Sequence, residues 1–256
     1  MLTKGEMKME ARKLLLYLSK KYNGNWDKIM SAIQNKEDVP PEEIEKVYKD
    51  NKEDFICLLD IQYPSTLKHS LRPPFVLYYK GNINLLNSIK TKVAIGGVRS
   101  LTMREEDVAN LIFNDDSNVH ILDLESGIGK YLEEQRPYDN IIVSATALDN
   151  VEEVNEGTLY ISEKPIGSTK EINSFHSHET RRISAALCDK ALVFSCVQGC
   201  AVLNLINFAL HLGKDVLAVP TSPLVKDYEN NSLIREGAIP VYDAVSYREE
   251  TKQRDF

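Results

Sequence analysis

Hydrophobic and polar positions change their spacing partway along the chain. Between residues 10 and 51 the sequence is strongly charged, and apolar residues such as Leu14, Leu15 and Leu18 recur at helical spacing. Two prolines at positions 40–41 are followed by acidic residues, the composition that suits the first turn of a further helix. This part of the chain is therefore predicted to form three helices.

From Phe75 onward, short apolar runs alternate with amphipathic stretches. Several runs are apolar throughout, as strands covered on both faces require. The expected strands are residues 75–81, 92–97, 119–124, 140–145, 157–162, 190–196 and 215–220. Helical patterns fall between them at residues 103–114, 126–136, 177–187 and 200–213. This alternation predicts right-handed βαβ units and an α/β fold with an open, mostly parallel, doubly wound sheet.

The change of pattern predicts two units, a small all-helical one at residues 1–62 and an α/β one at residues 63–256. A chain of 256 residues with 43% hydrophobic content can supply a core for both. Its first residues lack the apolar stretch of a signal peptide, and no apolar run approaches the roughly 20 residues that a membrane helix needs. We expect a cytoplasmic protein without a membrane partner.

Charge and cysteine content restrict the chemistry. The net charge of −7 gives an average field that repels a phosphate backbone, so nucleic-acid binding requires a local basic patch. The four cysteines, Cys57, Cys188, Cys196 and Cys200, show no CxxC spacing. Neither a zinc site nor a disulfide framework is expected, and we predict reduced, mostly buried thiols without a metal or a cofactor.

Three of the expected strands end in segments that suit an anion. In doubly wound sheets ligands bind at the carboxyl ends of strands, where free N–H groups at helix N-termini favour negative charge. Residues 96–100 read Gly-Gly-Val-Arg-Ser, in which the glycines let the backbone approach a phosphate and Arg99 can bind it bidentately. Residues 125–130 and 198–200 also combine glycine with the start of an expected helix. We expect these three loops to converge on one anion site.

Motifs of the common catalytic folds are missing from the sequence. It has no GxGxxG with a downstream acid and no GxxxxGK[ST], so a dinucleotide site and a P-loop are not supported. Ser126 lies in ESGIG rather than GxSxG, and no nucleophile is paired with a base. The sequence therefore indicates a binding protein without a catalytic residue.

The order of motifs between Tyr63 and Asp243 resembles the DprA/Smf family of DNA-processing proteins. The segments that carry the resemblance are YPSTLKHSLRPPFVLYYKGN at 63–82, KVAIGGVRS at 92–100, LYISEKPIGS at 159–168, DVLAVP at 215–220 and NSLIREGA at 231–238. The resemblance implies an extended Rossmann-like fold, a homodimer and sequence-independent binding of single-stranded DNA. It also implies loading of a RecA-type recombinase during natural transformation, and a variable N-terminal domain of the sterile-alpha-motif kind at residues 1–62.

Departures from the family pattern concentrate in the loops of the expected site. The segment at 122–129 loses the first glycine of the family's SGLARGID and places Asp123 and Glu125 beside the expected phosphate. In place of the family's FPxRNR, the chain has Phe175, then HSHET, then Arg181 and Arg182. These changes predict weaker anion binding than the family pattern implies.

Carried over residue by residue, the resemblance gives a set of expected DNA or phosphate ligands. Arg99 is the first of them, the glycines would bring backbone N–H groups to phosphates, and the lysines and remaining arginines would supply local positive charge. The full set is Gly97, Arg99, Ser126, Gly127, Lys130, Lys164, Lys170, Arg181, Arg182 and Gly199.

Two other functions stay open at this stage. A non-catalytic nucleotide-binding protein or sensor on the same scaffold would account for the acidic changes in the loops. Enzymes that cleave nucleoside phosphates share a PGGxGTxxE motif, whose nearest equivalent here, QGCAVLN at 198–204, lacks the glutamate. Catalysis is therefore the least favoured of the three.

Overall fold

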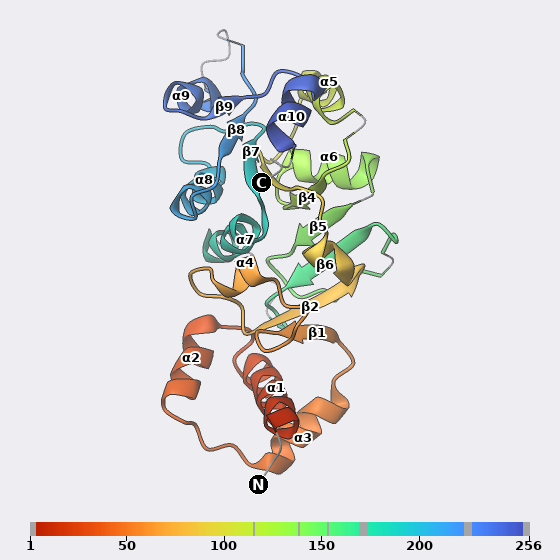
Figure 1. Ribbon diagram of the computed structural model, residues 1–256, viewed down its shortest axis with the longest axis vertical. Helices are drawn as coiled ribbons and strands as arrows, with labels where there is room; N and C mark the ends of the chain where they lie inside the picture. The colour runs from red at the N-terminus through yellow and green to blue at the C-terminus, as the bar shows by residue number, and fades with distance from the viewer. Residues whose placement is uncertain are drawn as a thin grey trace.

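The computed structural model describes residues 4–114, 116–137, 139–152, 154–168, 174–222 and 227–252. The molecule is elongated, with the N-terminal helices at one end and the α/β part above them (Figure 1). None of the helices in this described part of the chain is long and apolar enough to cross a bilayer.

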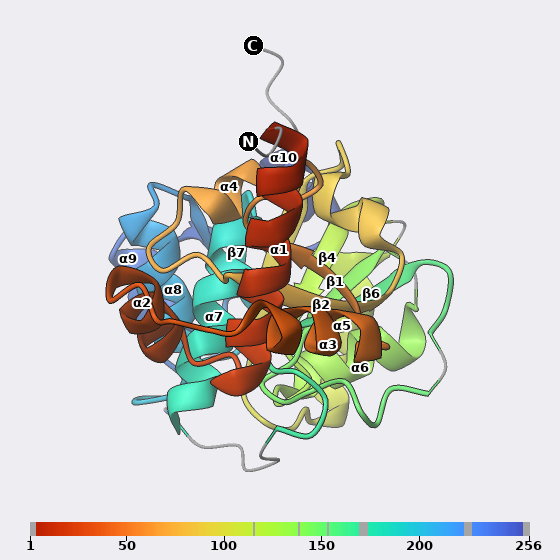
Figure 2. The ribbon, with the colours of Figure 1, turned by 90° about the horizontal axis from the view of Figure 1, so that it is seen from below.

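Three helices open the chain, as their apolar spacing predicts. They are α1 (Lys4–Lys21), α2 (Trp26–Gln34) and α3 (Pro41–Asp50). The side-chain oxygen of Asn25 accepts a hydrogen bond from the Lys28 N–H and caps α2. Leu16, Leu18 and Ile29 are buried in a hydrophobic cluster that also includes residues of the first two strands. The helices are thus attached to the sheet through a shared hydrophobic cluster, and Figure 2 shows α1 lying across the ribbon of the α/β part.

Within the described residues, nine strands form one sheet in the order β1-β2-β6-β5-β4-β3-β7-β8-β9. They are β1 (Asp54–Cys57), β2 (Val76–Gly81), β3 (Lys92–Gly96), β4 (Val119–Leu122), β5 (Asn140–Val143), β6 (Thr158–Ser162), β7 (Lys190–Val193), β8 (Val216–Ala218) and β9 (Ile239–Pro240). From β6 to β9 the neighbours are parallel, whereas β1 and β2 add antiparallel pairs at one edge. The mostly parallel, doubly wound sheet is confirmed.

Each face of the parallel part is covered by its own helices. One hydrophobic cluster joins α7 and α8 to one face, and another joins α5, α6 and α10 to the opposite face (Figure 1). The helices and short turns of this part are α4 (Ser65–Lys68), η1 (Ile83–Asn87), α5 (Met103–Phe113), α6 (Gly127–Gln135), α7 (Ser174–Leu187), α8 (Val202–His211), α9 (Asn230–Arg235) and α10 (Ala244–Thr251). All residues of β4 and β5 are buried, which explains why these strands are apolar apart from His120 and Asn140.

A tight turn between α1 and α2 packs the helical module, which consists of α1, α2 and α3, against the α/β part. Gly24 adopts a φ of +67°, and a Cβ at this position would lie 2.0 Å from the carbonyl oxygen of Glu163. Two residues later, the Trp26 Nε1–H donates to the Pro73 carbonyl at 2.9 Å, and its ring stacks on Phe75 with centroids 5.6 Å apart. The orientation of the helices is therefore fixed by backbone contact as well as by hydrophobic packing.

We predict that Gly24→Ala destabilises the protein more than Gly213→Ala does. Both glycines have a left-handed φ, which costs an alanine about 1 kcal/mol, but a Cβ on Gly213 meets nothing within 4 Å. The additional clash at Gly24 has a backbone atom as its partner and must displace the helical module. Urea unfolding of both variants measures the difference, and equal midpoints would show that the turn is not in close contact with the sheet.

Candidate functional site

The sheet changes winding direction between β3 and β7. These two strands are adjacent and parallel, with Gly96 opposite Val193, yet the chain runs outward from β3 through β4 to β6 and returns at β7. The connections from their carboxyl ends lead to α5 and α8, which cover opposite faces. In doubly wound folds such a point opens a crevice for ligands.

The three loops expected to converge are joined by hydrogen bonds. The Val98 N–H donates to Ser195 Oγ at 3.0 Å, which links the loop after β3 to the loop after β7. The Gly127 N–H donates to the Val98 carbonyl at 2.7 Å, which adds the start of α6. A Cβ on Gly127 would lie 2.7 Å from the Leu101 nitrogen. Only glycine therefore lets the start of α6 approach the loop after β3 this closely.

Several groups expected to hold phosphate are engaged within the protein at this contact. The N–H of Gly127 is used by Val98, and Ser126 Oγ caps α6 by accepting from the Gly129 N–H at 3.0 Å. Ser126 and Gly97 are buried. The start of α6 therefore supports the loop after β3.

Arg181 makes an ion pair with a carboxylate of the same sheet edge. Its Nη2 lies 2.7 Å from Asp123 Oδ2, and only 7% of the arginine is exposed. The carboxylate of Asp123 and the guanidinium of Arg181 thus neutralise each other's charge.

Arg182 is buried and connects three segments of the chain. Its Nη2 donates to both carboxylate oxygens of Glu163, at 2.8 and 2.9 Å, and its Nη1 donates to the Arg72 carbonyl. Burial raises the pKa of Glu163, and the guanidinium opposes that shift. Lys164 directly follows Glu163, and its Nζ lies 3.4 Å from Glu179 Oε2 on α7. Arg182 and Lys164 therefore both pair with carboxylates of the protein itself.

Arg99, Lys130 and Gly199 are the exposed members of the expected set. Among the described residues, the side chains of Arg99 and Lys130 have no hydrogen-bond or ion-pair partner. Gly199 adopts a φ of +72° in the turn between β7 and α8. Lys170, which also belongs to the expected set, lies outside the described residues.

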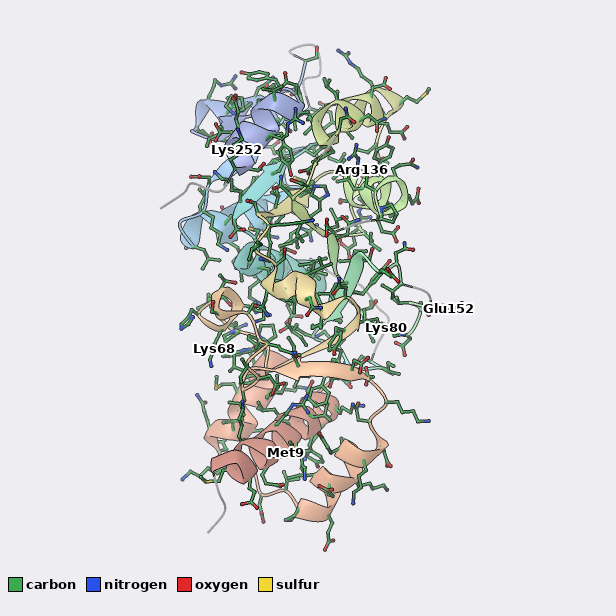
Figure 3. The ribbon with its side chains drawn as sticks, turned by 45° about the vertical axis from the view of Figure 1, so that its right-hand side comes forward. Met9, Lys68, Lys80, Arg136, Glu152 and Lys252 are labelled. Carbon is green, nitrogen blue, oxygen red and sulfur yellow. The ribbon has the colours of Figure 1, made fainter. Side chains whose placement is uncertain are left out.

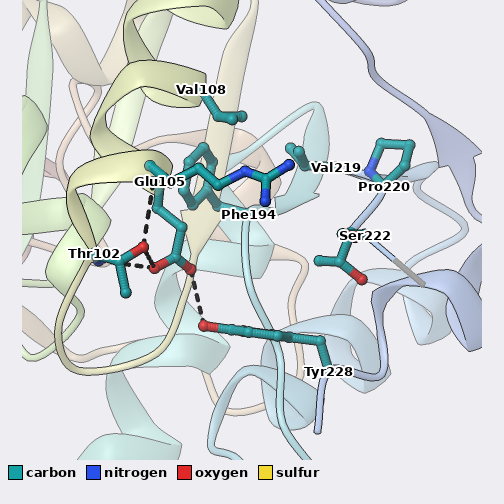
Figure 4. Close-up of a pocket in the computed structure, with 10 residues that line it drawn as sticks. Thr102, Glu105, Val108, Phe194, Val219, Pro220, Ser222 and Tyr228 are labelled. Carbon is teal, nitrogen blue, oxygen red and sulfur yellow. Dashed lines mark hydrogen bonds between the residues drawn. The ribbon is translucent and has the colours of Figure 1, made fainter. Parts of the chain in front are cut away.

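A cavity of about 240 Å³ lies beside the loop that carries Arg99. Its wall contains Phe194 after β7, Pro220 after β8 and the exposed Arg104 at the start of α5. The Tyr228 hydroxyl donates to Glu105 Oε1 at 2.9 Å and closes one side (Figure 4). Burial and this carboxylate raise the pKa of Tyr228 to about 12, so the hydroxyl stays protonated at neutral pH.

Sequence reasoning missed Arg104 and Tyr228 as members of this site. Arg104 could have been found from its position, because it follows the strand-end loop directly and stands in the first turn of an expected helix. Tyr228 could not, since its contact with Glu105 joins segments far apart in the chain.

A second cavity, of about 410 Å³, lies at the ends of β4 and β5. It is on the other side of the switch point, the place between β3 and β7 where the winding direction changes. Asp123, Glu125 and Glu152 line it. At its outer side Lys80 Nζ donates to the Val151 carbonyl at 2.7 Å, and Figure 3 shows Lys80 and Glu152 close together. The carboxylates that line this cavity disfavour an anion in it, so the cavity beside α5 is the better candidate for an anion site.

Comparison with protein families gives one match that spans most of the chain. The model of the DNA recombination-mediator protein A family matches residues 54–127 and 139–252. No curated protein sequence matches significantly.

Two solved structures share the fold. DNA processing protein A from Streptococcus pneumoniae superposes with a TM-score of 0.70 at 21% identity, over 99% of each chain. DNA processing protein A from Helicobacter pylori, whose structure addresses its single-stranded DNA binding mode, has a TM-score of 0.65 at 19% identity. That match covers 78% of this chain and 96% of the other.

The buried pair of Arg182 and Glu163 leads to a stability prediction. Arg182→Gln should lower the free energy of unfolding by about 3–5 kcal/mol, because it leaves a carboxylate buried without its cation. Lys130→Gln, which changes an exposed side chain by the same charge, should leave the urea midpoint unchanged. If the two variants unfold at the same midpoint, Arg182 does not have the structural role described here.

Proposed function

Because the chain belongs to the DNA recombination-mediator protein A family, which acts in DNA processing and recombination, we propose that it binds single-stranded DNA at the carboxyl edge of its sheet. The binding surface in this proposal is the loop after β3 together with the start of α5. It contains Arg99, Arg104 and the cavity that Arg104 and Tyr228 line.

The observation that carries the proposal is the exposed guanidinium of Arg99. It lies at the switch point, where ligands bind in this class of fold, and no described residue pairs with it. A guanidinium presents planar N–H donors that fit two phosphate oxygens at once. Arg104, exposed and also unpaired among the described residues, supplies a second cation a few residues later.

The cavity beside these cations suits the base of a nucleotide whose phosphate the cations bind. Phe194, Val219 and Pro220 give it an apolar wall, and bases can pack on such surfaces whatever their sequence. Contacts to phosphates carry no sequence information either. Both features support binding without a sequence preference.

Charge distribution sets the conditions for binding. The chain carries a net charge of −7, and Arg181, Arg182 and Lys164 are already paired with carboxylates. With Arg99 and Arg104 as the phosphate contacts, the salt dependence should therefore be modest, about 0.7 in log–log slope for each contact.

The proposal includes a homodimer and delivery of the bound strand to a RecA-type recombinase. Both rest on the family resemblance. The protein acts in this account by holding the strand, and no chemical step is required of it.

We predict that Arg99→Glu and Arg104→Glu each weaken binding of a labelled oligo-dT strand at least about tenfold, since a charge-assisted hydrogen bond contributes roughly 1.5–3 kcal/mol. Each should also reduce the salt dependence by about 0.7 in log–log slope, the value of one phosphate contact in a single strand. Fluorescence anisotropy at several salt concentrations measures both quantities.

Arg248→Glu is the matched control, with the same change of residue and charge. Arg248 is exposed in the last turn of α10. This helix ends at Thr251, whose carbonyl accepts from Thr91 Oγ1 at 2.8 Å just before the amino end of β3, away from the proposed site. Equal losses in all three variants would indicate a general charge effect. Absence of DNA binding by the unmodified protein at low salt, with binding of a labelled nucleotide, would favour a nucleotide sensor instead.

A further inference from the structure

Two cysteines lie side by side in the loop between β7 and α8. The sulfur atoms of Cys196 and Cys200 are 2.7 Å apart, compared with about 2.0 Å in a disulfide. Both are free thiols in the structure. Their separation in the sequence is not the CxxC pattern, so the pair is recognisable only in three dimensions.

The two thiols differ in their access to solvent. Cys196 is completely buried, whereas Cys200 is half-buried and follows the exposed residues Gln198 and Gly199. A reagent in solution therefore reaches Cys200 first. The backbone of Cys196 is fixed in its buried position, because its N–H donates to Asn230 Oδ1 at 2.8 Å.

The surroundings of Cys200 favour its thiolate. The hydrogen bond from the Cys196 thiol lowers the pKa of Cys200 to about 6, assisted by the backbone N–H groups of Val202 and Leu203 at the start of α8. The same hydrogen bond and burial raise the pKa of Cys196. Of the two thiols, Cys200 is therefore the one that loses its proton more readily.

The remaining cysteines lack these properties. Cys57 and Cys188 are buried, and burial raises the pKa of each thiol to about 11. They serve as internal controls for reactivity within the same chain.

We propose that Cys196 and Cys200 form a redox site that closes reversibly to an intramolecular disulfide by exchange with a small-molecule disulfide. Cys200 is the attacking thiol and Cys196 the resolving one. The site is independent of the DNA-binding proposal, although Ser195 beside it accepts the hydrogen bond from Val98 in the loop that carries Arg99.

The reaction has two steps. The Cys200 thiolate attacks one sulfur of the external disulfide, so that a mixed disulfide forms and one external thiolate leaves. Cys196 then loses its proton to that thiolate and attacks the Cys200 sulfur, which releases the second external group as a thiolate that takes a proton from solvent. Overall the protein loses two protons and two electrons, and the external disulfide is reduced to two thiols.

Peptide mass spectrometry can test this assignment on the full chain. The protein is incubated with oxidised glutathione, quenched in acid, alkylated and digested with trypsin. Cleavage after Lys190 and Lys214 leaves both cysteines in one peptide, and Cys57 and Cys188 fall in separate ones. The peptide 191–214 should lose two hydrogen atoms and resist alkylation, while Cys57 and Cys188 remain alkylated.

Single substitutions separate the two roles. Cys196→Ser should accumulate glutathione on Cys200, because the resolving thiol is missing, and Cys200→Ser should stay reduced. Cys188→Ser is the matched control and should oxidise as the unmodified protein does. A peptide 191–214 that remains fully alkylated, or a Cys196→Ser protein that takes up no glutathione, would overturn the proposal.

Discussion

The arrangement of this protein depends on the buried guanidinium of Arg182. It joins α7 to Glu163 after β6 and to the Arg72 carbonyl before β2, three segments that are distant in the sequence. The backbone carbonyl of the same Glu163 faces Gly24, at the turn of the helical module. One ion pair therefore anchors α7, the sheet edge and the N-terminal helices. Removal of either partner would leave a charge inside the protein without compensation.

The same anchoring decides where a ligand can bind. With α7 fixed, Arg181 beside Arg182 pairs with Asp123, and the start of α6 is taken up by contacts to Val98. Cations that the sequence places in the site are thus used to hold the loops together. Of the expected cations, Arg99 and Lys130 remain exposed, and Arg99 is carried by a loop that is hydrogen-bonded to both neighbouring loops, with Arg104 close behind it. A loop held by hydrogen bonds, whose guanidinium pairs with no described residue, is well prepared for a phosphate, because little conformational entropy is lost on binding.

The fold was largely predictable from the sequence, and the site only in part. The apolar runs at 92–97 and 119–124 and the helical patterns at 103–114 and 126–136 correspond to β3, β4, α5 and α6. Strands β1 and β9 were missed, because β1 directly follows the charged helical segment and β9 has only two residues. Convergence of the strand-end loops follows from parallel topology. The partners of Arg181 and Arg182 do not, since they depend on packing between distant segments, and the proximity of Cys196 to Cys200 likewise depends on the turn at Gly199.

The central claim is that, among the arginines expected to bind DNA, Arg99 is an exposed ligand whereas Arg181 and Arg182 are buried structural groups. Arginine modification by phenylglyoxal, read by peptide mass spectrometry with and without an oligo-dT strand, tests both halves at once. The account predicts that Arg99 is modified in the free protein and protected by DNA, while Arg182 is unreactive in both states. Equal modification of Arg99 with and without bound DNA, or ready modification of Arg182 in the folded protein, would contradict it.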